Sequence, residues 1–282
     1  MKSADSDALI FLRQYHADQP GMSPRTFAAG RCANGQNSYS QLLDGWDPAT
    51  ERLRILDLAC GDGFLLELIR RRYHCAIELV GIDLSATELA AARARLGQGV
   101  ELLLRAAQKL GLPPGSIDHV VCHMALMLMA PVEPVLAEVA AVLKPGGSFT
   151  AIVNDLKVES PALIAFSRLC RRFSDRDGLP PLAIGDPRLR SAAGIREVFA
   201  AMGGRFAPPE LTAMSLDLGG RVDGVLDVLM GFYPPWRLKA ASRVAFVEEL
   251  RAGLAALADP GGHVALDLPL LKIRARTRSP GN

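Results

Sequence analysis

Apolar and polar positions along the chain predict strands joined to helices by tight turns. The apolar run at residues 53–58 is rich enough to form a buried strand, and it stops at the turn Cys60, Gly61, Asp62 and Gly63. A helical spacing of apolar residues begins directly after this turn. Glycine suits the turn because a residue without a Cβ lets a ligand approach the main chain and tolerates a positive φ. The free N–H groups of the next helix would then face the ligand.

Similar patterns recur along the chain. The further predicted strands cover residues 79–84, 100–105, 119–123, 148–153, 211–218 and 264–273. Ser85 is placed to cap a helix that runs to Leu96, and a second helical face covers residues 132–143. Strands that alternate with helices form a parallel sheet with right-handed crossovers, and ligands of such sheets lie beyond the carboxyl ends of the strands.

The segments outside this alternating core carry weaker patterns. A short helix is predicted over residues 6–15, and residues 21–40 have the composition of a loop with one helical turn near Phe27. After residue 154 we expect an insertion helix, a loop, a last crossover helix and two amphipathic helices, at 161–173, 173–190, 192–202, 222–233 and 237–257. The predicted organisation is an N-terminal helical cover at 1–45 and one domain at 46–282, with a ligand-binding half at 50–154 and helical insertions at about 156–190 and 221–258.

Composition narrows the class of protein. The chain of 282 residues has a net charge of +2 and no strongly basic stripe, so nothing in it indicates nucleic-acid binding. Its five cysteines are scattered without metal-ligand spacing, which favours reduced thiols, no disulfide and no metal site. No apolar run is long enough to cross a bilayer, so a soluble, cytoplasmic protein is expected. A monomer and a homodimer both stay open.

The residues around the glycine turn indicate the chemistry of the ligand. A dinucleotide fingerprint needs a third small residue, but Leu66 stands at that position. Asp57 and Asp62 make the turn acidic, which is unfavourable for phosphate and favourable for a cation. Asp83 ends the second predicted strand, where such folds place the acceptor for two ribose hydroxyls. The sequence therefore predicts a cationic nucleoside.

The sequence ILDLACGDG followed by GIDLS resembles motifs I and II of the class I S-adenosylmethionine-dependent methyltransferases, and the later LKPGG turn is similar to that family as well. The resemblance implies an α/β fold with a Rossmann-like, seven-stranded, mostly parallel sheet. It also implies S-adenosyl-L-methionine as cofactor and S-adenosyl-L-homocysteine as product. Asp83 would hold the ribose, and the main chain at 59–63 would face the methionine half. The cofactor-binding residues expected are Asp57, Ala59, Cys60, Gly61, Asp62, Gly63, Phe64, Asp83, Leu84, Ser85, Ala106, Ala107, Gln108 and His123.

One stretch departs from the family pattern. Arg105 and Ala106 stand where glycine and aspartate are usual, so the carboxylate that would accept from the adenine amino group is absent. The amide oxygen of Gln108 could accept this hydrogen bond instead. Contact with adenine through the main chain alone is an equal alternative.

Methyl transfer from a sulfonium is an in-line displacement, so positioning of the acceptor can supply much of the catalysis. A base helps only when the acceptor must lose a proton, and a histidine is then favoured. His123, just past the fourth strand, is the predicted base, although a cofactor contact or a hydrogen-bonded wall is the alternative. The expected substrate-pocket residues are Tyr15, His16, Arg31, Tyr39, Met124, Met127, Tyr233 and Trp236. Core packing is the competing interpretation for the methionines, and a proline-stopped helix end for the segment 232–236.

The preferred function is methyl transfer to a small-molecule acceptor in biosynthetic or specialised metabolism, because covering segments flank the core on both sides. A nucleic-acid amino methyltransferase would show an N- or D-P-P-Y or -F sequence after the fourth strand, but residues 122–127 have CHMALM. No acidic loop for a protein arginine is evident. The alternative is a protein that binds S-adenosylmethionine without transferring methyl, as a regulator or a cyclase-type enzyme. The acceptor and the methylated atom stay open.

Overall fold

Seven strands form one sheet in the computed structural model, which describes residues 4–44, 52–73, 77–157, 160–181 and 183–278. Their order across the sheet is β3-β2-β1-β4-β5-β9-β6. The strands are β1 Arg54–Leu58, β2 Glu78–Asp83, β3 Val100–Leu104, β4 Ile117–His123, β5 Leu143–Asn154, β6 Glu210–Asp217 and β9 Asp267–Arg276. The strands β1 to β5 pair with one another in parallel, whereas β9 runs antiparallel to both β5 and β6. The predicted fold class is confirmed.

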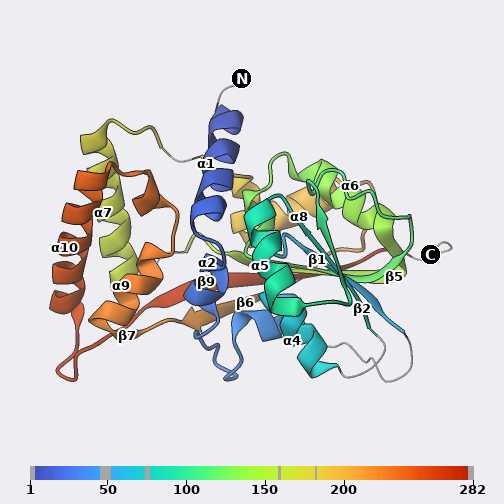
Figure 1. Cartoon of the computed structure of the whole chain (residues 1–282), viewed down its shortest axis with the longest axis horizontal. Coiled ribbons are helices and arrows are strands. Elements are labelled where there is room, and N and C mark those ends of the chain that lie inside the picture. The colour runs from blue at the N-terminus through green and yellow to red at the C-terminus, as the bar shows by residue number, and fades with distance from the viewer. Residues whose placement is uncertain (1–3, 45–51, 74–76, 158–159, 182, 279–282) are drawn as a thin grey trace.

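Helices cover both faces of this sheet (Figure 1). Apolar side chains of α4 and α5 join one buried cluster, and those of α6 and α8 join the other. These helices span Phe64–Arg72, Ala86–Leu96, Val132–Val142 and Ala192–Ala200. The alternation of strands and helices is incomplete, because residues 105–116 connect β3 to β4 without a helix. Pro113 and Pro114, flanked by two glycines with positive φ, explain this interruption.

The N-terminal segment contains more regular structure than its sequence predicts. It forms α1 (Ala4–Asp18), α2 (Met22–Phe27) and α3 (Ser38–Gln41), so the expected loop with one turn is in fact two short helices after a longer first one. The side chain of Asn37 accepts a hydrogen bond from the Ser40 N–H at 2.8 Å and caps α3. Helices of four to six residues are too short to show an apolar period, so only their caps could have indicated them.

The segments after β5 form a group of helices beside the sheet, at the left of Figure 1, with α1 standing between this group and α5. The group consists of α7 (Pro161–Asp177), α9 (Val222–Met230) and α10 (Ala240–Leu257). The rings of Phe173 and Phe246 meet edge to face at 5.7 Å and join α7 to α10. The remaining elements are the short helices η1 Leu126–Leu128, η2 Pro187–Arg190 and η3 Pro234–Arg237, and the strand pair β7 Gly220–Arg221 and β8 His263–Val264.

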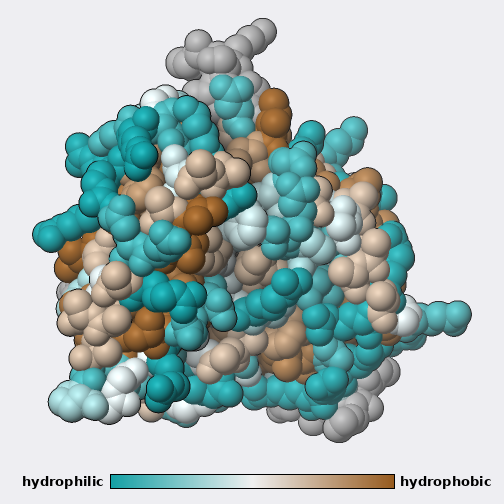
Figure 2. Space-filling view, turned by 60° about the vertical axis from the view of Figure 1, so that its left-hand side comes forward, coloured by the Kyte–Doolittle hydropathy of each residue, from teal (hydrophilic) through white to brown (hydrophobic). Residues whose placement is uncertain are grey.

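The surface and the cysteines carry few special features. Hydrophilic residues dominate the face shown in Figure 2, with apolar side chains between them. No described helix is long and apolar enough to span a membrane.

The described cysteines, Cys32, Cys60, Cys122 and Cys170, are buried free thiols, and Cys75 lies outside the described residues.

Candidate active site

The turn after β1 presents its main chain to a cavity. Ala59 and Gly61 have positive φ values of 62° and 52°. A non-glycine residue in this region stores strain, which is typical of functional sites. A Cβ on Gly61 would meet only Glu88 Oε2, at 3.8 Å, so the space above this glycine is open. A Cβ on Gly63 would instead meet Leu96 Cδ1 at 2.8 Å. Gly61 therefore permits ligand approach, whereas Gly63 permits the close packing of α4 on α5.

Asp83 at the end of β2 is held by main-chain donors. Its Oδ2 accepts from the Gly61 N–H at 2.9 Å, and its Oδ1 accepts from the Ser85 N–H at 2.8 Å. Burial raises the pKa of Asp83 above its ordinary value, although these two hydrogen bonds act in the opposite direction. A carboxylate oxygen can accept more than one hydrogen bond, so each oxygen keeps capacity for a ligand hydroxyl. The geometry suits the diol of a ribose.

Asp57 is the most unusual acid of the site. Its side chain is buried, and Oδ2 has no hydrogen-bond partner among the described residues. Burial, with the nearby charges of Asp83 and Asp62, raises the pKa of Asp57 well above its ordinary value. Asp62 is paired with the guanidinium of Arg95, so its charge is offset. The charge of Asp57 is not offset in this way, and a cationic ligand in the cavity would relieve that cost.

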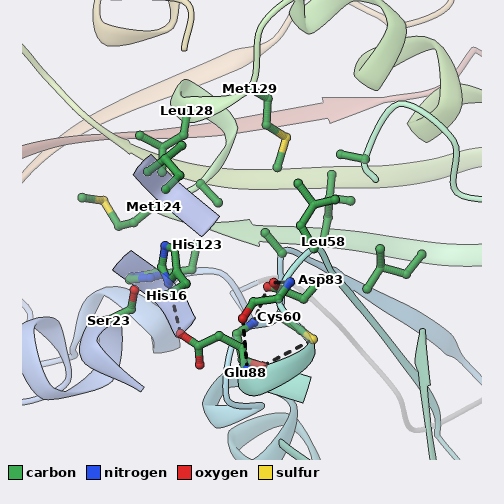
Figure 3. Close-up of a pocket in the computed structure, with 18 of the residues that line it drawn as sticks. His16, Ser23, Leu58, Cys60, Asp83, Glu88, His123, Met124, Leu128 and Met129 are labelled. Atoms are coloured by element: carbon green, nitrogen blue, oxygen red, sulfur yellow. Dashed lines mark hydrogen bonds and ion pairs between the residues drawn. The ribbon is translucent and has the colours of Figure 1, made fainter. Parts of the chain in front are cut away.

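A further carboxylate, Glu88 of α5, connects the floor of the cavity to the N-terminal cover. Glu88 Oε1 lies 3.1 Å from His16 Nδ1, and Glu88 Oε2 accepts from the Gly21 N–H at 3.0 Å. The His16 ring also approaches Tyr233, with 3.3 Å between Nε2 and the hydroxyl oxygen. Figure 3 shows the His16 ring beside the Glu88 carboxylate. The sequence analysis did not predict Glu88, because an acid in the first turn of a helix is typical of solvent-exposed dipole pairing.

The cavity has a volume of about 270 Å³ and extends from the β1 turn to the exit of β4. Every expected cofactor-binding residue lines it except Gly63. Of the expected substrate-pocket residues, the lining contains His16, Tyr39, Met124 and Tyr233. Lining residues outside both predicted sets include Leu9, Leu12, Ser23, Leu128, Met129 and Ile184. Figure 3 places Met124, Leu128 and Met129 opposite Cys60 and Glu88, so one wall is apolar and the other acidic.

Two expected substrate-pocket residues point away from this cavity. The guanidinium of Arg31 is bonded to the main-chain carbonyls of residues 28–30, and its main chain bridges to Asp217 of β6. Met127 is buried in the cluster on the α6 side of the sheet. Neither residue lines the cavity, because its position follows local turn geometry and core packing.

Two aromatic residues support the cavity from behind. The Tyr15 hydroxyl donates to the Gly231 carbonyl at 2.8 Å, and its ring contacts the Tyr233 ring at 4.8 Å. Trp236 Nε1 donates to the Met230 carbonyl at 2.7 Å. Both side chains therefore support the segment around Tyr233, and neither lines the cavity. Of the expected pocket residues Tyr15, His16, Tyr233 and Trp236, only His16 and Tyr233 line the cavity.

His123 lines the cavity at the end of β4 as a buried, neutral imidazole. Its Nε2 lies 2.9 Å from Ser38 Oγ, and its ring stacks on Tyr39 with centroids 3.6 Å apart. Its Nδ1 has no hydrogen-bond partner among the described residues. Burial lowers the pKa of His123 to about 3. A base with so low a pKa takes up a proton poorly near neutral pH, so the geometry favours the alternative prediction of a hydrogen-bonding wall.

The end of the cavity expected to face adenine keeps the departure seen in the sequence. Arg105 lines the cavity, and its guanidinium donates to the Leu110 carbonyl, so it turns toward its own loop. Ala106, Ala107 and Gln108 also line the cavity. No carboxylate takes the place of the missing aspartate in this lining stretch. Gln108 and the main chain remain the two candidates for this contact.

The strand order, the glycine turn after β1 and the acid at the end of β2 define a class of protein with a Rossmann-like sheet that binds a nucleoside at the carboxyl ends of its strands. The acidic floor of the cavity further distinguishes this site from a dinucleotide site. Among the described residues, no group of three or more histidine, cysteine or acidic side chains could hold a metal ion.

Comparison with known proteins identifies the class more closely. Residues 55–147 match the family described as "Methyltransferase domain". The chain is 33% identical over 137 residues to ribosomal RNA small subunit methyltransferase C of Hahella chejuensis, a match covering 46% of this chain and 39% of that protein. It is 35% identical over 106 residues to the ubiquinone biosynthesis O-methyltransferase of Aeromonas salmonicida, covering 36% and 43%. The solved structure of YcgJ protein from Bacillus subtilis has a TM-score of 0.54 at 21% identity, covering 81% of this chain and 93% of that chain.

The predicted recognition is confirmed, because residues 55–147 form a class I S-adenosylmethionine-dependent methyltransferase domain. The matches span less than half the length of the two curated relatives, and the likeness to YcgJ shows the fold. One of these relatives is named for ribosomal RNA and the other for ubiquinone biosynthesis, so their names indicate no common acceptor.

Proposed function

We propose that this protein binds S-adenosyl-L-methionine and transfers its methyl group to a small-molecule acceptor. The observation that carries the proposal is a single cavity with two unlike walls. One wall is acidic and built from the β1 turn and the end of β2, and the other is apolar and built from the exit of β4. A cationic cofactor and an apolar acceptor would meet in this space.

The residues present fit the cofactor. Asp83 would accept from the ribose hydroxyls, and the main chain at 59–61 would lie against the methionine half. Asp57, whose Oδ2 is buried without a partner among the described residues, would face the positive charge of that half. Ala107 and Gln108 would border the adenine. When bound, the cofactor supplies a methyl group on a positively charged sulfur, which leaves the protein mainly the task of positioning.

The other wall supports a small acceptor with a large apolar part. Met124, Leu128, Met129 and Ile184 are among the lining side chains that offer apolar contact beyond the acidic floor. Methionine adapts to ligands of irregular shape. His16 and Tyr233 border the space from the cover and the insertion. A cavity of about 270 Å³ with this apolar lining supports a small acceptor better than a folded RNA or protein.

Calorimetry with S-adenosylmethionine, S-adenosylhomocysteine and NADH tests the cofactor assignment. We expect micromolar binding of the first two, equivalent to about −8 kcal/mol, and no binding of NADH. A screen of apolar acceptors with a labelled methyl group then tests transfer. Binding without transfer to any acceptor class, with the cofactor recovered intact, would favour the cofactor-binding alternative. Absence of binding would contradict the proposal itself.

A further inference from the structure

A chain of three side chains crosses the cavity between elements that are far apart in sequence. Glu88 of α5 contacts His16 of α1 at 3.1 Å through the ring nitrogen Nδ1. The other ring nitrogen, Nε2, lies 3.3 Å from the hydroxyl of Tyr233, which follows α9. All three side chains line the cavity, and Glu88 is buried. The fold thus supplies a hydrogen-bonding partner for each ring nitrogen of His16.

The chemistry of the two partners fixes the proton on the ring. A carboxylate can only accept, so Nδ1 must donate to Glu88. Burial, with the nearby charge of Glu88, raises the pKa of Tyr233, so its hydroxyl stays protonated and is available as a donor. A neutral imidazole has one donor and one acceptor, so Nε2 carries the lone pair that accepts from Tyr233. The atom of His16 that faces the cavity beside Tyr233 is therefore the basic one.

His123, the residue singled out by the sequence, lacks these features. No carboxylate contacts its ring, and burial alone lowers its pKa to about 3. His16 is part-buried, and the Glu88 carboxylate would stabilise the imidazolium that forms when His16 takes up a proton. The two histidines of the site thus differ in the property a base needs.

Resting on the function proposed above, we propose that His16 Nε2 is the general base for a hydroxyl-bearing acceptor and that Glu88 is its positioning residue. In the step, a bond forms between the acceptor oxygen and the methyl carbon while the bond from that carbon to sulfur breaks. The sulfur keeps the electron pair of the broken bond and becomes a neutral thioether. The hydroxyl proton passes to His16 Nε2, and the resulting positive charge lies against Glu88. The acceptor hydroxyl takes the place of the Tyr233 hydroxyl at Nε2.

The groups that face His16 come from four elements. Glu88 and the nearby Asp83 are the acids, and Tyr233 and Tyr15 are the phenols, of which Tyr15 contacts the ring edge to face at 5.2 Å. The phenols stay neutral because burial raises the pKa of each. Among the described residues, the polar partners of the His16 ring are Glu88 and Tyr233, and neither is a cation.

Imidazole nitrogen NMR on the protein without any ligand tests the proton assignment. In a long-range proton–nitrogen spectrum, assigned by the loss of one histidine signal in H16Q, we expect His16 with Nδ1 protonated and Nε2 unprotonated. Glu88→Gln should disturb this pattern, because an amide can donate as well as accept. The matched control Glu101→Gln, on β3, should leave it unchanged. A His16 ring protonated on Nε2 in the wild-type protein would overturn the proposal.

Kinetics with an acceptor found in the screen test the role in turnover. His16→Ala should lower kcat by about 100-fold or more with little change in cofactor affinity, and added imidazole should restore part of the loss. Glu88→Gln should lower kcat less, and the exposed control His263→Gln should have no effect. If His16 only latched the cover, its loss would weaken cofactor binding and imidazole would restore nothing, which would overturn the proposal. Calorimetry of wild-type protein with S-adenosylmethionine tests the underlying function separately.

Discussion

The two walls of the cavity are built by different means. The acidic wall uses the main chain of the β1 turn and acids at strand ends, and its geometry follows from a few glycines and hydrogen bonds. The apolar wall and the cover use side chains from α1, the β4 exit, the loop at 183–185 and Tyr233, which only tertiary packing brings together. Local sequence determines the first wall, and the assembled fold determines the second.

This difference agrees with the chemistry that each wall would serve. A constant cofactor can be recognised by main-chain atoms whose positions depend on backbone conformation alone. An acceptor that differs between related enzymes is met by side chains on covers and insertions, which tolerate sequence change. We therefore expect substitutions at the β1 turn and strand ends to affect folding and cofactor binding, and substitutions in the cover to affect turnover and acceptor choice.

The buried titratable groups should make the free energy of unfolding depend on pH. Burial lowers the pKa of His123 to about 3 and that of His119 to about 4, so between those values and the ordinary 6.5 the folded protein binds fewer protons than the unfolded chain. The free energy of unfolding should fall as pH falls through this window. With about 1.4 kcal/mol for each pKa unit, the loss from His123 is on the order of 3 kcal/mol at pH 4. Asp57, whose pKa is raised, acts in the opposite sense.

Denaturant unfolding between pH 4 and 8 measures this contrast. His123→Asn should flatten the loss of stability in acid. Asp57→Asn should stabilise the ligand-free protein near pH 8, because the buried charge is removed, and should at the same time weaken cofactor binding. A wild-type protein whose stability does not fall between pH 6.5 and 4, and whose profile is unchanged in H123N, would contradict the buried neutral state of His123.

Two glycines with nearly equal φ test what the β1 turn requires. Gly63 has φ 77° and Gly35, in the cover, has φ 78°. A Cβ on Gly63 would meet Leu96 and Ala92, whereas a Cβ on Gly35 would meet nothing within 4 Å. Gly63→Ala should therefore cost about 2–3 kcal/mol of unfolding free energy, and Gly35→Ala about 1 kcal/mol from backbone strain alone. If thermal or denaturant unfolding shows equal losses of unfolding free energy in the two variants, the packing of α4 on α5 adds nothing to the cost of Gly63→Ala.

Much of the acidic wall could be predicted from the sequence because its signals are local. The run before Ala59, the glycines after it and Asp83 at the next strand end are fixed in spacing, and Ser85 caps α5 as expected, accepting from the Glu88 N–H. Of these residues, Asp57 and Leu58 at the end of the run, Gly61, Asp83 and Ser85 line the cavity, whereas the other apolar residues of the run are core and Gly63 packs against α5. Seven strands were found where apolar runs predicted them.

The other wall could not be predicted in the same way. Glu88 belongs to the site only because α1 brings His16 against it, and a contact 72 residues apart leaves no local pattern. The sequence pattern around Leu128 and Met129 does not distinguish residues that line a pocket from residues that pack in the core. Arg31 was predicted as a substrate-pocket residue because it lies in the segment before the glycine turn, yet its guanidinium is bonded to neighbouring carbonyls. A long-range contact therefore decided the place of Glu88, whereas local turn geometry decided that of Arg31.

Asp83→Asn tests recognition by the acidic wall without a change of shape. The amide keeps one oxygen for the main-chain donors at Gly61 and Ser85, but it loses the charge and places an NH₂ group where a second acceptor stood. We expect S-adenosylhomocysteine affinity to fall by about 1–2 kcal/mol in calorimetry, with a small change in thermal stability. Unchanged affinity would mean that Asp83 does not bind the cofactor and that the acidic wall recognises it through the main chain alone.

Arg31→Ala should have the smallest effect, although Arg31 was predicted as a substrate-pocket residue. Its guanidinium donates to the carbonyls of residues 28–30 in a solvent-exposed turn, where water can replace each hydrogen bond. Its main-chain bridge to Asp217 does not depend on the side chain. Cofactor affinity, kcat and acceptor KM should stay within about twofold of wild type. A larger change confined to the acceptor KM would mean that the cover rearranges when the acceptor binds, and that the apolar wall extends to the turn before α3.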